Sequence, residues 1–311
     1  MIDQKSSLST YLKAINYTFQ IAKHAVLGLF EDKCFRSSAA LSFYALFSIA
    51  PIVYLAVYVA SMFAADIDFQ QKIIEQFSLV VGDKAAGGIT VLLETLGEES
   101  QSKFQLIGGM VILAFSATNI FIQIQNTFND IYKVQPRAGV NLIKQVLDRV
   151  ISLGIILSLG FLLIVSFVLD SVVIAFRDYL FDFFNNAAVI VIQLTQILML
   201  IGLVSAVIYA MFQFLPDVHL PKKYKISGSL LVAFMLLLGK YAISIYIGSS
   251  KLNELGGASA SVILLMLWIY YTSLILFLGA EVIKGMAKVD GCFLQPRRYA
   301  TKVDLVVVSE S

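Results

Sequence analysis

Polar side chains recur at helical spacing inside stretches of sequence that are otherwise apolar. In the segment that ends near residue 130 they step by three or four positions, which places them on one face of a helix. They are Ser116, Asn119, Gln123, Asn126 and Asp130. Inside a membrane, such groups need a hydrogen-bonding partner or a water-filled face. Their amides and hydroxyls could bind a polar group through hydrogen bonds.

Two more apolar segments carry polar groups toward the same end, so we predict a polar cavity that opens to the cytoplasm. Pro51 would break a helix at the floor of this cavity. The predicted lining is Ser42, Tyr44, Ser48, Pro51, Ser116, Asn119, Gln123, Asn126, Tyr209 and Gln213. Alternatively, these groups only join helices through hydrogen bonds, each worth on average less than about 1 kcal/mol.

One ionisable residue near the end of the last apolar segment, Glu281, needs a partner of opposite charge. Lys240 lies in the preceding segment at a different depth, because the two segments run in opposite directions. Arg36, just before the first apolar segment, has about the same depth as Glu281. We therefore predict an ion pair between Arg36 and Glu281 at the inner edge of the membrane.

The sequence offers no catalytic constellation. It has two histidines and two cysteines without metal-ligand spacing, and it contains no P-loop and no nucleophile elbow. Cys34 and Cys292 both fall on the predicted cytoplasmic side, where a disulfide is not expected. The net charge of +2 is not gathered into a basic stripe, so nucleic acid is not an expected partner. We expect a protein that is not an enzyme and that needs no cofactor and no metal.

Six long apolar segments must position these residues. Of the 311 residues, 59% are hydrophobic and 14% are charged, which is too little polar surface for a soluble domain of this size. The predicted membrane spans are about 39-63, 104-124, 150-174, 187-215, 226-248 and 257-283. The stretches before, between and after them alternate in basic content, and every second stretch, starting with the first, holds 17 of the 23 Lys and Arg residues in total. Both termini should therefore be cytoplasmic.

The sequence thus predicts an all-α polytopic membrane protein in three parts. Residues 1-38 form a cytoplasmic amphipathic helix, which lies either on the membrane surface or on the protein's own cytoplasmic face. Residues 39-285 form the membrane domain, and its acidic outer loop, 66-103, should contain short amphipathic helices. Residues 286-311 form a partly ordered cytoplasmic tail.

Four runs of sequence, in order, resemble the YihY/BrkB family. They are residues 36-51 (RSSAALSFYALFSIAP), 126-132 (NTFNDIY), 209-216 (YAMFQFLP) and 257-281 with Trp268 and Tyr270. One departure is Gly256, which stands where the family has an aromatic residue. The resemblance implies a six-span protein of the inner membrane. It also brings an old ribonuclease label, which the absence of a metal cluster and of a basic groove speaks against.

The resemblance and the predicted cavity together favour a transporter or flippase-like protein. Its substrate would be a lipid, another amphiphile or a small solute, entering among the first, second, fourth and sixth spans. Without an ATP-binding motif, movement would be driven by a gradient or be passive. The alternative is a membrane scaffold for envelope biogenesis that transports nothing. Membrane lipids are expected partners in both cases, and the sequence leaves the oligomeric state open.

Overall fold

The computed structural model describes residues 2–46, 119–137, 188–249 and 258–303, together with residues 71, 74, 75, 78, 86, 87 and 154. Within these ranges the chain is mostly helical, as the sequence predicts. The described helices are α1 (Ile2–Glu31), a helix from residue 34 to 46, a helix from 119 to 132, α8 (Ala188–Phe214), α9 (Lys222–Ser249) and α10 (Ala258–Val289).

In the described part of the chain, three helices are long and apolar enough to cross a membrane. The apolar windows are Ile197–Phe214 in α8, Lys222–Ala242 in α9 and Val262–Val289 in α10. They coincide with the predicted spans 187-215, 226-248 and 257-283. Residues 39–46 and 119–124, which belong to the first two predicted spans, are also helical. Apart from single residues, the third predicted span and the outer loop 66-103 lie outside the described residues.

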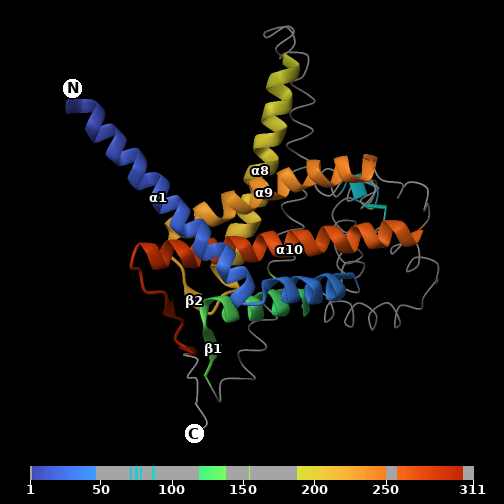
Figure 1. Ribbon diagram of the computed structural model, residues 1–311. Coiled ribbons are helices and arrows are strands. Elements are labelled where there is room, and N and C mark those ends of the chain that lie inside the picture. Colours follow the sequence, from blue (N-terminus) through green and yellow to red (C-terminus); the bar gives the residue numbers. More distant parts are fainter. Residues whose placement is uncertain are drawn as a thin grey trace.

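The last two apolar helices, α9 and α10, lie alongside each other (Figure 1). Glycines allow the close approach: a Cβ atom at Gly239 would lie 2.1 Å from the ring of Tyr271, and one at Gly279 would lie 2.3 Å from Val232. The Tyr271 hydroxyl donates a 2.6 Å hydrogen bond to the carbonyl of Met235 on α9. Small residues at such contacts let helix backbones come together in a lipid environment.

Three buried aromatic rings join three of the helices. Phe128, from the 119–132 helix, lies 5.4 Å from Phe212 on α8 and 6.1 Å from Phe277 on α10, measured between ring centroids. All three side chains are fully buried. Aromatic pairs at these separations contribute about 0.5–1.5 kcal/mol beyond the burial of their area. This cluster fixes the end of the 119–132 helix against α8 and α10.

Two short antiparallel strand pairs, which the sequence analysis did not predict, close one end of the structure. Strand β1 (Val134–Pro136) pairs with β4 (Ala300–Lys302), with Val134 opposite Lys302. Strand β2 (Val218–His219) pairs with β3 (Gln295–Pro296). The predicted tail therefore continues the folded structure as far as residue 303. It connects the ends of α8, α10 and the 119–132 helix, which Figure 1 shows close together.

The N-terminal helix α1 packs one of its faces against α10. Ile21 and Ala25 are buried against Val282. On another face of α1, the apolar side chains of Ile15 and Phe19 are about two-thirds exposed. The two positions foreseen for this helix are therefore compatible, because one face contacts the protein while the other remains open.

Candidate functional site

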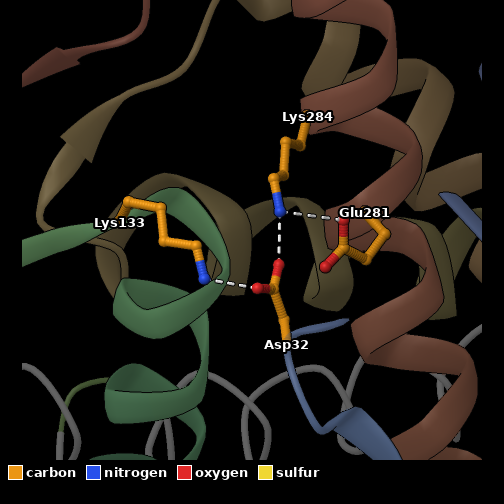
Figure 2. Close-up of polar contacts among 4 residues, drawn as sticks. All are labelled: Asp32, Lys133, Glu281 and Lys284. Carbon is orange, nitrogen blue, oxygen red and sulfur yellow. Dashed lines mark hydrogen bonds and ion pairs between the residues drawn. The ribbon is translucent and has the colours of Figure 1, made fainter. Parts of the chain in front are cut away.

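A buried carboxylate, Asp32, connects three segments at the end of the structure that carries the strand pairs. It lies in the turn after α1 and accepts hydrogen bonds from Lys133, which follows the 119–132 helix, and from Lys284 on α10. Lys284 also lies 3.3 Å from Glu281. Figure 2 shows these four side chains pointing toward one another. We call them the Asp32 cluster. Both carboxyl side chains are almost fully buried, whereas the lysines are partly exposed.

Local backbone features place these groups. Lys33 and Lys133 have positive φ angles of 56° and 54°, the left-handed conformation in which helices often end. Their helices therefore end abruptly beside each other. Gly28, on the last turns of α1, makes room for the carboxyl group of Glu281: a Cβ atom there would lie 2.2 Å from Oε2. The cluster thus depends on two helix ends and one glycine.

The electrostatics of the cluster favour an ionised Asp32. Burial raises the pKa of the Asp32 carboxyl, but hydrogen bonds involving Glu281, Lys133 and Lys284 lower it by more, so that it lies below its ordinary value. Burial also raises the pKa of the neighbouring Cys34 thiol to about 12, with added contributions from the charges of Glu281 and Asp32. Cys34 is therefore a protonated thiol at neutral pH, whereas nucleophilic reactivity requires the thiolate.

A second buried carboxylate, Asp217, holds the loop between α8 and α9. Its Oδ2 accepts a 2.8 Å hydrogen bond from the Asn129 amide, and its backbone N–H donates a 2.9 Å bond to Asn129 Oδ1. Gln125 adds a 3.3 Å bond to Oδ1. The Asp217 carbonyl accepts from the Arg297 backbone N–H. These contacts satisfy a group that is 1% exposed and attach the tail to the 119–132 helix.

Two of the predicted cavity residues, Tyr209 and Gln213, meet at the end of α8. The buried Lys225 donates a hydrogen bond to Gln213 Oε1, and its ammonium lies 5.2 Å from the centre of the Tyr209 ring. Arg297 Nη2 donates a 2.5 Å bond to the Gln213 carbonyl. The structure therefore surrounds these two residues with cations from α9 and the tail, which the sequence analysis did not include in the site.

A cleft of about 440 Å³ adjoins the Asp32 cluster and separates the end of α10 from the tail. Four lysines contribute to its wall, namely Lys133, Lys284, Lys288 and Lys302. The other lining residues include Ile131, Tyr132, Ala287, Cys292, Phe293 and Leu294. The cleft thus combines positive charge with apolar surface, so it suits an anionic group attached to an apolar one.

The structure places the other predicted cavity residues apart from these contacts. Asn119 and Asn126 are exposed and Gln123 is partly exposed, while Gln125 and Asn129 form the buried polar face of the same helix. Ser42 is buried and donates to the carbonyl of Ala39.

Of the remaining four predicted lining residues, Tyr44 is about half exposed. Ser48, Pro51 and Ser116 lie outside the described residues. The cavity among the spans stays a prediction.

The predicted ion pair between Arg36 and Glu281 requires correction. In the described part of the chain, the cation that lies within ion-pair distance of Glu281 is Lys284, at 3.3 Å. Arg36 is exposed on the helix that follows the turn. Equal depth does not determine the direction in which a side chain points. The turn at residues 32 and 33 directs Asp32 inward in its place.

Sequence reasoning missed Asp32, Lys133 and Asp217, because it searched for polar groups inside the apolar segments. These three residues lie just beyond segment ends, where charged residues are ordinarily solvated. A usable signal was present: Asn129 lies four residues after Gln125, so both amides occupy one face of the helix. That face is the one that binds Asp217.

The apolar helices, with a buried polar layer at one end, define an integral membrane protein. The chain belongs to the family described as virulence factor BrkB, which matches residues 25–290. This confirms the resemblance that the sequence motifs indicated.

Curated relatives carry the name UPF0761 membrane protein. One from Teredinibacter turnerae is 28% identical over 305 residues, covering 93% of this chain and 64% of the relative. One from Chlorobium chlorochromatii is 23% identical, covering 82% of this chain and 57% of the relative. One from Stenotrophomonas maltophilia is 26% identical, with coverages of 83% and 58%. The chain therefore spans about three-fifths of the length of these relatives. No solved structure matches it.

Proposed function

We propose that this protein moves an amphiphile or a small solute across the cytoplasmic membrane, as a six-span transporter or flippase-like protein with both termini in the cytoplasm. The observation that carries the proposal is the buried Asp32 cluster beside an open cleft, at the end of helices long enough to cross a membrane. Buried ionisable groups at membrane helices are expensive and usually mark a substrate or ion path.

The arrangement suggests how the residues would act. The cleft would receive the substrate on the cytoplasmic side, and the polar groups of the predicted cavity would replace its hydration within the membrane. Tyr209 and Gln213, which lie beside Lys225, would form part of this route. Movement would be passive or driven by a gradient, since the sequence has no ATP-binding motif.

Reconstitution tests the proposal directly. The full chain in vesicles is expected to accelerate the transfer of fluorescent phospholipids between leaflets, measured by quenching with a reagent that reaches the outer leaflet only. Tyr209→Phe combined with Gln213→Leu should slow the transfer, whereas Gly202→Ala, on an exposed part of α8 with open space around it, should not. Transfer no faster than in empty vesicles, across lipid and small-solute panels, would reject transport.

The rival function is a scaffold that organises envelope proteins without transport. The observation in its favour is the exposed apolar face of α1, with Ile15 and Phe19 about two-thirds exposed and Val26 half exposed. Such a face suits a membrane surface or a partner helix. If Asn119, Gln123 and Tyr209 can be replaced without phenotype while deletion of residues 1–30 abolishes function, the scaffold is favoured over the transporter.

A further inference from the structure

The cleft beside α10 carries more positive charge than its neighbours neutralise. Of its four lysines, Lys133 and Lys284 bind Asp32, and Lys284 also lies near Glu281. Lys288 and Lys302 have no carboxylate within ion-pair distance among the described residues, and both side chains are exposed. Like charges that converge without a counter-ion attract an anion. The cleft therefore has two cations available in addition to its internal ion pairs.

An unpartnered hydroxyl lies in the same wall. Tyr132 is one of the residues that line the cleft, and its hydroxyl is buried and has no hydrogen-bond partner among the described residues. A buried hydroxyl without a partner is costly, so such groups usually serve a ligand or a water molecule.

The apolar part of the wall indicates what the anion is attached to. Phe293 is 83% exposed at the cleft, and the ammonium of Lys302 lies 5.9 Å from the centre of its ring. Among the other apolar lining residues, Leu294 is partly exposed, whereas Ile131 and Ala287 are almost fully buried. An exposed aromatic ring beside lysines is typical of a site that binds a charged headgroup next to an apolar chain.

We propose that this cleft binds a phosphate group, with Lys288 and Lys302 as its main cationic contacts. The apolar wall favours a phosphate carried by an amphiphile over free phosphate. The inference deepens the proposed function by naming the substrate class, and it rests on that function only where it assigns the bound molecule as the one transported. Binding itself can be measured without transport.

The chain contains its own reporter for this test. Cys292 lines the cleft and is partly exposed, whereas Cys34 is fully buried and is a protonated thiol at neutral pH. A maleimide should therefore modify Cys292 selectively in the full chain in detergent. The rate is measured by mass spectrometry with dihexanoyl phosphatidic acid, inorganic phosphate or dihexanoyl phosphatidylcholine as competitor.

Phosphatidic acid at about ten times its Kd should slow the labelling of Cys292 by about tenfold, because the rate follows the unoccupied fraction. Phosphatidylcholine, whose phosphate is screened by choline, should give little protection. Greater protection by phosphatidic acid than by inorganic phosphate assigns the site to an amphiphile, and equal protection assigns it to soluble phosphate. No protection by either phosphate compound, or equal protection by phosphatidylcholine, would overturn the proposal.

A double variant tests the assigned residues. Lys288→Gln with Lys302→Gln should raise the Kd for phosphatidic acid by about tenfold or more, because two cations near the phosphate are lost. Lys222→Gln with Arg298→Gln removes the same charge from exposed residues outside the cleft lining and should leave the Kd nearly unchanged. Equal weakening by both pairs would show a general charge effect and contradict the site.

Thermal unfolding of each variant confirms that it is folded. The test also separates the two proposals. Protection of Cys292 in a protein that moves no lipid would retain the phosphate site and reject transport. Transport without protection would retain transport and reject the site.

Discussion

Asp32 stabilises the structure as the common partner of two lysines. Its side chain is 2% exposed, and it binds Lys133 and Lys284 from segments more than 100 residues away. Asp32→Asn would leave both ammonium groups without this counter-ion. Removing one partner of a fully buried pair costs about 3–5 kcal/mol, and because these lysines are partly exposed we expect about 2–3 kcal/mol here.

Unfolding in detergent measures this loss as a lower midpoint of denaturation. The matched control is Glu31→Gln, which removes an acidic group at the adjacent exposed position and should change the midpoint little. Equal midpoints for Asp32→Asn and the control would contradict the stabilising role of the cluster.

The Asp32 carboxylate should also make the stability of the fold depend on pH. Its pKa is lower in the folded chain than the ordinary value of 3.8, so the unfolded chain binds the proton more tightly. The contribution of Asp32 to stability is therefore present above pH 3.8 and is lost as pH falls from there through the lower folded pKa. The difference in midpoint between wild type and Asp32→Asn should be large at neutral pH and should shrink in that acidic range. A difference that widens on acidification would contradict the direction of the pKa shift.

Gly28 is required by the carboxyl group that packs on it. In Gly28→Ala, the new Cβ would lie 2.2 Å from Glu281 Oε2 and 2.4 Å from Cδ. Glu281 is 1% exposed and has little room to withdraw. Overpacking of this kind costs about 1–3 kcal/mol. Gly202→Ala, whose Cβ would meet no atom within 4 Å, is the matched control. Unfolding midpoints should fall for the first variant only.

At the level of elements, apolar length was the most reliable signal. Helices α8, α9 and α10 correspond to the predicted spans 187-215, 226-248 and 257-283. A long apolar helix is the element that exposes apolar side chains to lipid while its backbone groups hydrogen-bond to one another. The strand pairs β1 with β4 and β2 with β3 could not be predicted in this way. They contain two or three residues each, and their pairing depends on where the helices end.

For the polar residues, the sequence predicts which helix carries them but not which of its faces packs against the protein. The sequence correctly identified the 119–132 helix as one with polar faces, but it selected Asn119, Gln123 and Asn126, while Asn129 is the residue that binds Asp217. Helical spacing groups residues by face and does not say which face packs. The Arg36 prediction failed for the same reason. A partner's position is set by tertiary structure, which a single helix pattern does not contain.

The tail is expected to hold several helix ends together. A chain that ends after Leu294 would lack β3 and β4, and it would uncover Val134 and Val218, each 2% exposed in the structure. Burial of such a side chain is worth about 1.5–3 kcal/mol, so the truncated chain should unfold at clearly lower temperature. Removing only residues 304–311 keeps both strands and serves as the control. Equal stability of the two truncated chains would contradict this role.

At the scale of the whole molecule, the polar contacts of Asp32 and Asp217 connect stretches that the distribution of basic residues assigns to one side of the membrane. Asp32, Lys133, Asp217, Lys284 and Arg297 come from four separate stretches, and the predicted topology places all of them on the cytoplasmic side. The structure brings them into two neighbouring polar clusters at the end where the strand pairs lie (Figure 1). Charge distribution and tertiary contacts therefore agree that these stretches share one side of the membrane.

The positive-inside distribution further predicts which side that is. In intact cells, a maleimide that cannot cross the membrane should fail to label Cys292, and it should label Cys292 once the membrane is permeabilised. Cys34 provides no competing signal, because its thiol is buried and protonated. A Cys292→Ser variant gives the background of the labelling. A fluorescent protein fused after residue 311 should fold and fluoresce only if that end is cytoplasmic.

Rapid labelling of Cys292 in intact cells would place the clusters and the cleft outside. A cleft that faces outward could not receive a substrate from the cytoplasm, so the proposed direction of entry would be wrong even if the phosphate site is correct.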